Sequence, residues 1–266
     1  MPFITAKGNR LNSVELGQVP LASPTFQVRK SFGWYEEGTD PEQALWVTPP
    51  RRKNKPGPGE RTDLASVPAV FWSLIASYGR QTAPAVLHDS ECWKVRVAHT
   101  SGEIAAGEAL ARRVRIDRNF RLGLRELDVA PFRAWLMWTF VSFERYQKHS
   151  IPKFLGMMLL ALIGLASLVL APIAAFTWHW PLWVSIPLLF LPLVTSLIAA
   201  PRWTQLVWLS YAGALLLPVA VLQIAAYLPY AGLENLVWVA RDRPRHKGSP
   251  ILGPTDLKNI KRSMAA

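Results

Sequence analysis

The pattern of hydrophobic and polar positions divides this chain of 266 residues into three regions. Residues 1–150 mix short apolar runs with charged and turn-forming residues, residues 151–240 are almost continuously apolar, and residues 241–266 are polar and basic. We therefore predict a small soluble α+β domain, then an α-helical transmembrane segment of two or three spans. A tail that is disordered or lies on lipid headgroups should follow.

The soluble region begins with patterns typical of strands and continues with patterns typical of helices. Aromatic and β-branched residues between Pro and Gly predict strands at 26–28, 32–35 and 44–47. The basic, Pro- and Gly-rich stretch 49–60 indicates a solvated hairpin loop more than a phosphate-binding patch. Capping residues, including Thr100 with Glu103, and prolines predict helices at about 68–79, 82–95, 103–127 and 131–147. The last of these is amphipathic and suited to lie along a membrane surface.

Three apolar stretches are candidate membrane spans: 154–176, 182–200 and 206–228. The first is uncharged and long enough to cross a hydrocarbon core of about 30 Å at about 1.5 Å per residue. A large soluble helical core would need charged outer faces. Between residues 154 and 240 only Arg202 and Glu234 are charged, which favours a membrane.

The charge pattern predicts that the N-terminal region lies on the cytosolic side of an inner, cytoplasmic membrane. Arg145, Lys148 and Lys153 precede the first candidate span, and basic residues concentrate on the cytosolic side of membrane proteins. The first ten residues lack the apolar core of a signal peptide. Three full crossings would place the basic tail outside, so either one candidate span is re-entrant or the tail breaks this tendency. The proline-rich second stretch is the weakest candidate, and we expect a multi-pass protein with both ends cytosolic. Membrane lipid then explains the net charge of +12 better than nucleic acid does.

The most informative polar grouping lies in the run Arg61-Thr62-Asp63-Leu64-Ala65-Ser66-Val67-Pro68 and in Leu87-His88-Asp89. It places two acids, a hydroxyl and an imidazole in an otherwise apolar stretch. Asp63 and Ser66 precede a predicted helix, and either residue alone is more often a cap that accepts backbone N–H groups than a catalytic group.

His88 lies on a predicted apolar helix, where a lone histidine is more often a core residue than a ligand. Glu91 and Cys92 follow at helical spacing and share its face. His88 with either of them could bind a metal ion, although one helix offers few ligands. Cys92 is the single cysteine, so no intrachain disulfide forms. Its position four residues from His88 is poor for nucleophilic attack.

Asp117 falls on the same apolar stripe of the long predicted helix as Val114 and Leu124. Burying a carboxylate is costly unless it is paired. One possible partner is Arg113 or Arg121, each one turn away on the same helix. The other is His88, which would create the arrangement of a general base or a metal centre.

Three separated blocks resemble the domain-of-unknown-function family 1353, which is common in tailed phages, prophages and bacteria. They are Thr62-Asp63-Leu64-Ala65-Ser66-Val67-Pro68, Ala85-Val86-Leu87-His88-Asp89 and Ile116-Asp117-Arg118-Asn119-Phe120. Ile116 stands where the family usually has Ala, and Ser90-Glu91-Cys92 replaces residues that are usually aromatic or aliphatic. The resemblance, over about residues 26–129, implies that Asp63, Ser66, His88, Asp89 and Asp117 form one set. It implies no particular reaction, and the apolar segment is not part of the core family pattern.

These observations lead to two main functional hypotheses. The first is a membrane-anchored, hydrolase-like enzyme in which His88 is the base or a metal ligand. Asp89 and Asp117 would orient it or share a divalent metal, and Asp63 and Ser66 would complete the site. The second is a non-catalytic, phage- or prophage-related membrane accessory that contacts other membrane or phage-related proteins, with the same residues fixing the fold. Nucleic-acid binding through the basic runs 51–55 and 112–125 is a weaker third reading.

Overall fold

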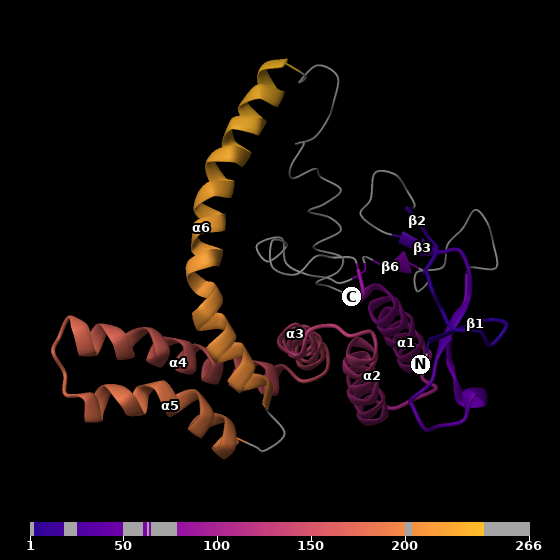
Figure 1. Ribbon diagram of the computed structural model, residues 1–266, viewed down its shortest axis with the longest axis horizontal. Helices are drawn as coiled ribbons and strands as arrows, with labels where there is room; N and C mark the ends of the chain where they lie inside the picture. Colours follow the sequence, from indigo (N-terminus) through magenta and orange to yellow (C-terminus); the bar gives the residue numbers. More distant parts are fainter. Residues whose placement is uncertain are drawn as a thin grey trace. The chain divides into compact units, whose positions relative to one another are not determined.

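The computed structural model describes residues 3–18, 26–49, 61–62, 64, 79–199 and 204–241. Within these residues, short strands come first and α-helices follow, which confirms the α+β class (Figure 1). The chain forms two compact units, Met1–Ala214 and Leu215–Ala266. Several predictions lie outside the described residues: the loop 49–60, the helix from Pro68, nearly all of the tail, and the side chains of Asp63 and Ser66.

The strands form two small antiparallel sheets. One has the order β1 (Phe3–Thr5), β4 (Phe32–Trp34), β5 (Leu45–Val47), with a 3-10 turn at Pro41–Gln43 before β5. The other has the order β2 (Leu16–Gln18), β3 (Phe26–Val28), β6 (Arg61–Thr62). The predicted strands at 26–28, 32–35 and 44–47 are confirmed to within one residue. The other three, β1, β2 and β6, were not expected.

Three helices pack beside one another in chain order: α1 (Thr82–Thr100), α2 (Ala106–Glu126) and α3 (Pro131–His149). An apolar cluster that includes Phe3, Phe32 and Leu87 joins strands to α1. A Cβ added to Gly123 of α2 would lie 3.1 Å from the Phe3 ring, so a glycine allows this close approach.

The expected cap formed by Thr100 and Glu103 is wrong. Helix α2 begins at Ala106 without a side-chain cap. The Thr100 hydroxyl donates instead to the carbonyls of Arg96 and Val97, at 2.9 and 3.0 Å, within its own helix. A hydroxyl on the last turn of a helix can satisfy that helix's carbonyls, which competes with capping the next one.

The apolar region forms α4 (Ile151–Phe176), α5 (Leu182–Ala199) and α6 (Thr204–Arg241). Among the residues that the structure describes, α4 alone is long and apolar enough to cross a membrane. The apolar stretch in α5, Leu182–Thr195, spans only about 21 Å at about 1.5 Å per residue. The described helices therefore do not support the expected two or three spans.

Apart from Met157, helix α4 buries small side chains, and it exposes large apolar ones. Its buried face carries Met157, Ala161, Gly164, Ser167, Ala171 and Ala174. Its exposed side chains include Leu155, Leu159, Leu162 and Phe176. Helix α5 runs back along α4 (Figure 1). A helix of a soluble protein normally has large apolar residues on its buried side, so α4 has the opposite arrangement.

Helices α3 and α4 are joined by a single residue, Ser150. The rings of Phe143 and Phe154 pack across this joint with centroids 4.6 Å apart. In Figure 1, α3 is seen nearly end-on whereas α4 lies in the plane of the view, so the two helices run in different directions. If α4 is perpendicular to a membrane, α3 is suited to lie along its surface, as its amphipathic sequence predicts.

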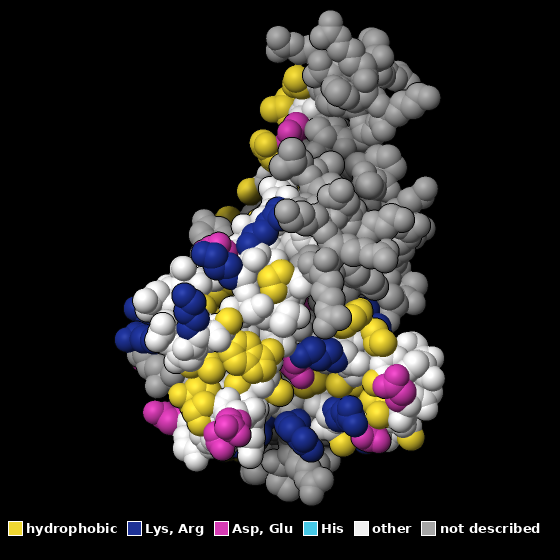
Figure 2. Space-filling model, turned by 90° about the vertical axis from the view of Figure 1, so that its right-hand side faces the viewer, with side chains coloured by type: hydrophobic (Ala, Val, Ile, Leu, Met, Phe, Trp, Pro, Cys, Tyr) yellow, Lys and Arg dark blue, Asp and Glu magenta, His cyan; other side chains and the backbone are white. Residues whose placement is uncertain are grey.

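The face on the strand side carries mixed charge. Figure 2 shows Lys and Arg side chains dispersed among Asp and Glu side chains and apolar groups there. One pair in this part of the molecule joins Arg118 of α2 to Glu36 after β4, with nitrogen–oxygen distances of 2.6 and 3.0 Å. The part of this face that the structure describes lacks the continuous basic stripe typical of nucleic-acid binding.

Candidate functional site

Three helices each contribute one charged side chain to a buried cluster. Nε2 of His88 in α1 lies 2.9 Å from Oδ1 of Asp117 in α2. Nη1 of Arg145 in α3 donates to the other oxygen, Oδ2 of Asp117. The side chains of His88 and Asp117 are 6% and 0% exposed. Asp117 is thus paired through both oxygens, which offsets much of the cost of burying its charge.

Helical spacing brings these groups to one interface. The buried positions of α2 include Arg113, Asp117 and Phe120, at offsets of four and three residues, which share a helix face. The Phe120 ring packs on the His88 imidazole with centroids 5.1 Å apart. The expected stripe was right for Leu124, which is fully buried like Asp117, and wrong for Val114, which is 48% exposed.

Asp89 lies at the opposite side of the imidazole. Its Oδ1 is 3.8 Å from Nδ1 of His88, beyond hydrogen-bond distance, and its side chain is 28% exposed. The hydroxyl of Thr62 donates to Asp89 Oδ2 at 2.5 Å and accepts the backbone N–H of Leu64 at 2.9 Å. Leu64 has a φ of 67°, a left-handed conformation that is rare for leucine. The Thr62 hydroxyl therefore stabilises both an unusual backbone conformation and the more exposed carboxylate.

Cys92 contacts the face or edge of the imidazole between its nitrogens. Its Sγ lies 3.7 Å from Nδ1 and 3.6 Å from Nε2 of His88. A thiol aligned with one nitrogen would be clearly closer to that one. The near equality supports the expectation that this pair is poorly arranged for nucleophilic attack. Glu91, the other expected neighbour, pairs with Lys94 at 2.5 Å.

The surroundings favour the charged form of His88. Burial alone would lower its pKa. The neighbouring Cys92, Asp117 and Asp89 outweigh burial and raise the pKa of His88 well above its ordinary value. The direction of this shift favours the imidazolium, which donates a proton, over the neutral imidazole, which accepts one.

Arg113 adds a further buried cation. Burial opposes its charge, but Cys92 and Asp117 raise the pKa of Arg113 further above its ordinary value. Its Nε and Nη2 have no hydrogen-bond acceptor among the residues that the structure describes. Buried donors of this kind are uncommon in proteins and often mark bound water, an ion or a functional group.

The structure thus brings His88, Asp89 and Asp117 together, whereas Asp63 and Ser66 lie outside the described residues. Of the two proposed partners for Asp117, the imidazole is the observed one. Arg121 instead stacks on two indole rings, 4.5 Å from the centroid of Trp135 and 5.0 Å from that of Trp138.

Sequence reasoning missed Arg145 and Thr62. Arg145 was interpreted as a charge that flanks the membrane, yet its side chain is 4% exposed and binds Asp117. Arg145 therefore does not face lipid headgroups, and it gives no support to the predicted cytosolic orientation of the N-terminal region. The sequence did contain a sign that Arg145 faces inward. It follows Trp138 by seven residues, which places it on the aromatic stripe of α3.

The expected metal site gains no support from this geometry. Within the described part of the chain, no group of three or more His, Cys, Asp and Glu side chains is arranged to hold a metal ion. Asp117 and Asp89 lie at different nitrogens of the His88 ring, so the three do not converge on one point. A divalent metal held by His88, Asp89 and Asp117 stays a prediction.

Comparison with known proteins gives one match. Residues 52–141 match the model of a family described as "Protein of unknown function (DUF1353)". This stretch contains the three sequence blocks and most of the helices that form the cluster. The searches of curated proteins and of solved structures gave no match.

Proposed function

We propose that the chain is a membrane-anchored protein whose N-terminal half carries a hydrolase-like acid–base site. The observation that supports it best is the line of contacts from buried Asp117 through His88 to the partly exposed Asp89. Asp117 and Arg145 position the imidazole, and Asp89 is the most exposed member of the line.

The proposed chemistry is hydrolysis of an ester or amide bond. Asp89 accepts a proton from water as the water oxygen adds to the acyl carbon. His88 donates a proton to the leaving group from Nδ1, the nitrogen that faces Asp89. Asp89 then returns its proton to His88 across the 3.8 Å that separates Oδ1 from Nδ1. This assigns His88 as an acid, because its raised pKa makes it a weak candidate for the base.

Anchorage is proposed from the reversed arrangement of α4. Small residues on the buried side of a membrane helix allow close helix packing, and large apolar residues face lipid. In this proposal α4 and α5 form a helical hairpin within the bilayer, with the N-terminal half on the cytosolic side. Lys148 and Lys153, which flank the start of α4, support that orientation.

The experiment uses the full-length protein in detergent micelles with chromogenic ester, anilide and phosphodiester substrates. Asp89→Asn should lower turnover by about 100-fold or more, since general acid–base groups contribute about 10²- to 10⁴-fold. The melting temperature should change little, because asparagine still accepts the Thr62 hydrogen bond. Glu91→Gln is the matched control, since Glu91 pairs with Lys94 and not with His88. Turnover that survives Asp89→Asn would reject the assigned chemistry.

A non-catalytic accessory protein is the second candidate. The complete burial of Asp117 and its pair with Arg145 favour it, because such networks can simply organise a helical core. In that case wild-type protein hydrolyses none of the substrates, and His88→Gln and Asp117→Asn change only the melting temperature. Elemental analysis of the purified protein tests the divalent metal separately.

A further inference from the structure

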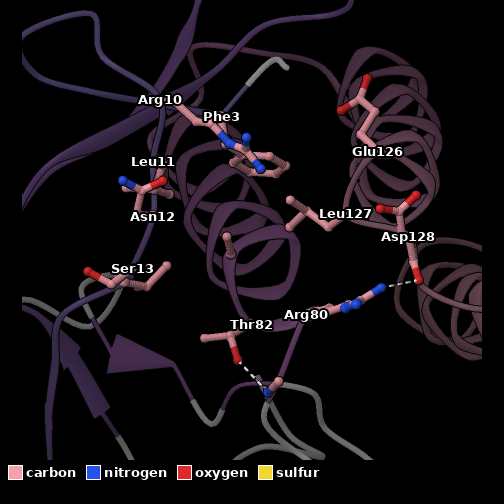
Figure 3. Close-up of a pocket in the computed structure, with 13 residues that line it drawn as sticks. Phe3, Arg10, Leu11, Asn12, Ser13, Arg80, Thr82, Glu126, Leu127 and Asp128 are labelled. Atoms are coloured by element: carbon pink, nitrogen blue, oxygen red, sulfur yellow. Dashed lines mark hydrogen bonds between the residues drawn. The ribbon is translucent and has the colours of Figure 1, made fainter.

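A cavity of about 490 Å³ lies where α1 begins and α2 ends (Figure 3). The connection between the two helices is at their opposite ends. The cavity is bounded by β1 and the loop after it, by the start of α1 and by the end of α2. Pockets that bind small ligands have volumes of about 300–1,000 Å³. Phe3 and Leu127 contribute apolar surface to it.

Two basic and two acidic side chains line this cavity: Arg10, Arg80, Glu126 and Asp128. In Figure 3 the carboxylates of Glu126 and Asp128 lie on the α2 side, Arg10 of the loop after β1 lies beside Phe3, and Arg80, just before α1, extends toward Asp128. Among the described residues, none of the four forms an ion pair with another. Arg80 donates to the backbone oxygen of Asp128 at 3.1 Å, and Glu126 accepts from Trp34 Nε1 at 2.7 Å.

The acidic side of the cavity is held in place. Asp128 has a φ of 55°, in the left-handed region usually occupied by glycine or asparagine after a helix. The backbone N–H of Val129 donates to Leu124 at 3.0 Å and closes this turn. Burial raises the pKa of Glu126 more than the Trp34 hydrogen bond lowers it, so a neighbouring cation would be favourable.

We propose that this cavity binds a small peptide-like zwitterion, an amino acid or a short peptide with free termini. Its ammonium group lies toward Glu126 and Asp128, its carboxylate toward Arg10, and an apolar side chain against Phe3. An anion alone would meet two carboxylates, and a cation alone would meet two guanidinium groups. A ligand with both charges matches the two carboxylates and Arg10.

This site is separate from the His88 cluster. Glu126 follows Asp117 by nine residues on α2, which corresponds to about 14 Å along the helix axis. The inference therefore does not depend on the proposed hydrolase chemistry.

Isothermal titration of the full-length protein in detergent micelles tests this proposal with three probes. They are the dipeptide Ala-Leu with free termini, its N-acetyl form and its C-terminal amide. The free dipeptide should bind, and each blocked form should bind at least about tenfold more weakly, as expected for loss of one charged contact. Equal binding of all three probes, or no binding of the free dipeptide, overturns the proposal.

Conservative variants then locate the binding. Asp128→Asn keeps a residue that tolerates the left-handed conformation, and Glu126→Gln keeps an acceptor for Trp34. Both should weaken binding of the free dipeptide at least about tenfold without lowering the melting temperature. Glu103→Gln, on the exposed connection between α1 and α2, is the control and should bind as wild type does. Wild-type affinity in both cavity variants rejects this location.

Discussion

Asp117 of α2 accepts a hydrogen bond from Arg145 of α3, and the two side chains are 0% and 4% exposed. The same carboxylate holds His88 of α1, so one acidic group connects three helices. Arg145 lies six residues before the start of α4. The cluster therefore also fixes the helix that leads into the candidate membrane span.

Arg145→Met should destabilise the protein by about 3–5 kcal/mol, because it leaves a buried carboxylate without its main counter-charge. Arg112→Met is the matched control. Arg112 pairs with Glu108 at 2.6 Å on the exposed side of α2, and such pairs contribute about 0–1 kcal/mol. Chemical unfolding followed by circular dichroism measures both. Equal losses in the two variants would show that the buried pair has no special role.

Stability should decrease as the pH rises above neutral, and His88 should account for part of that decrease. Burial opposes the charge of His88, but Cys92, Asp117 and Asp89 raise its pKa in the folded protein. The stabilisation is therefore complete below the unfolded-state pKa of about 6.5 and is lost as the pH rises through the folded-state pKa.

Melting temperatures of wild type and His88→Gln across this range provide the measurement. The advantage of wild type should become smaller as the pH rises. A constant difference between the two proteins would mean that His88 is not protonated in the folded state.

Gly164→Ala should destabilise the packing of α4, whereas Gly156→Ala should not. A Cβ at Gly164 would lie 2.5 Å from Ser210 Oγ and 3.2 Å from Pro192 Cβ, while a Cβ at Gly156 meets nothing within 4 Å. Overpacking costs about 1–3 kcal/mol, and alanine gains up to about 1 kcal/mol over glycine within a helix. Unfolding in mixed micelles with increasing dodecyl sulfate should separate the two variants. Matching midpoints would contradict the observed close approach.

Thr62→Val should cost about 1–3 kcal/mol, because the buried N–H of Leu64 loses its acceptor and Asp89 loses a donor. Thr62→Ser keeps the hydroxyl and should cost less. Thermal melts compare the variants at one pH. A serine variant as unstable as the valine variant would show that the methyl group, and not the hydrogen bonds, is what matters.

The helices and three of the strands could be predicted because their signals are local. Pro84 and Pro131 lie in the first turns of α1 and α3, and the apolar run of α4 needs no partner to be recognised. Helix ends were harder to predict. Helix α1 continues to Thr100, past the expected end near Val95, because the Thr100 hydroxyl satisfies carbonyls of its last turn.

The His88–Asp117 contact could be inferred because a carboxylate on an apolar stripe needs a partner, and the family resemblance groups both residues. Arg145 could not be inferred in the same way. In the sequence it stands near Lys148 and Lys153 and has the same charge as these membrane-flanking residues. Only the packing of α3 against α2 shows that it faces inward. The roles of Asp63 and Ser66 stay predictions.

The single residue between α3 and α4 limits where the cluster can act. One residue spans at most about 3.6 Å, so with α4 in a bilayer the end of α3 cannot leave the headgroup layer. Its encounters with molecules held in the same leaflet then become a search in two dimensions at high effective concentration. Molecules dissolved in the bulk gain no such advantage. A soluble version cut at Ser150 could therefore retain every contact of the cluster and still be a much poorer competitor for membrane-bound targets.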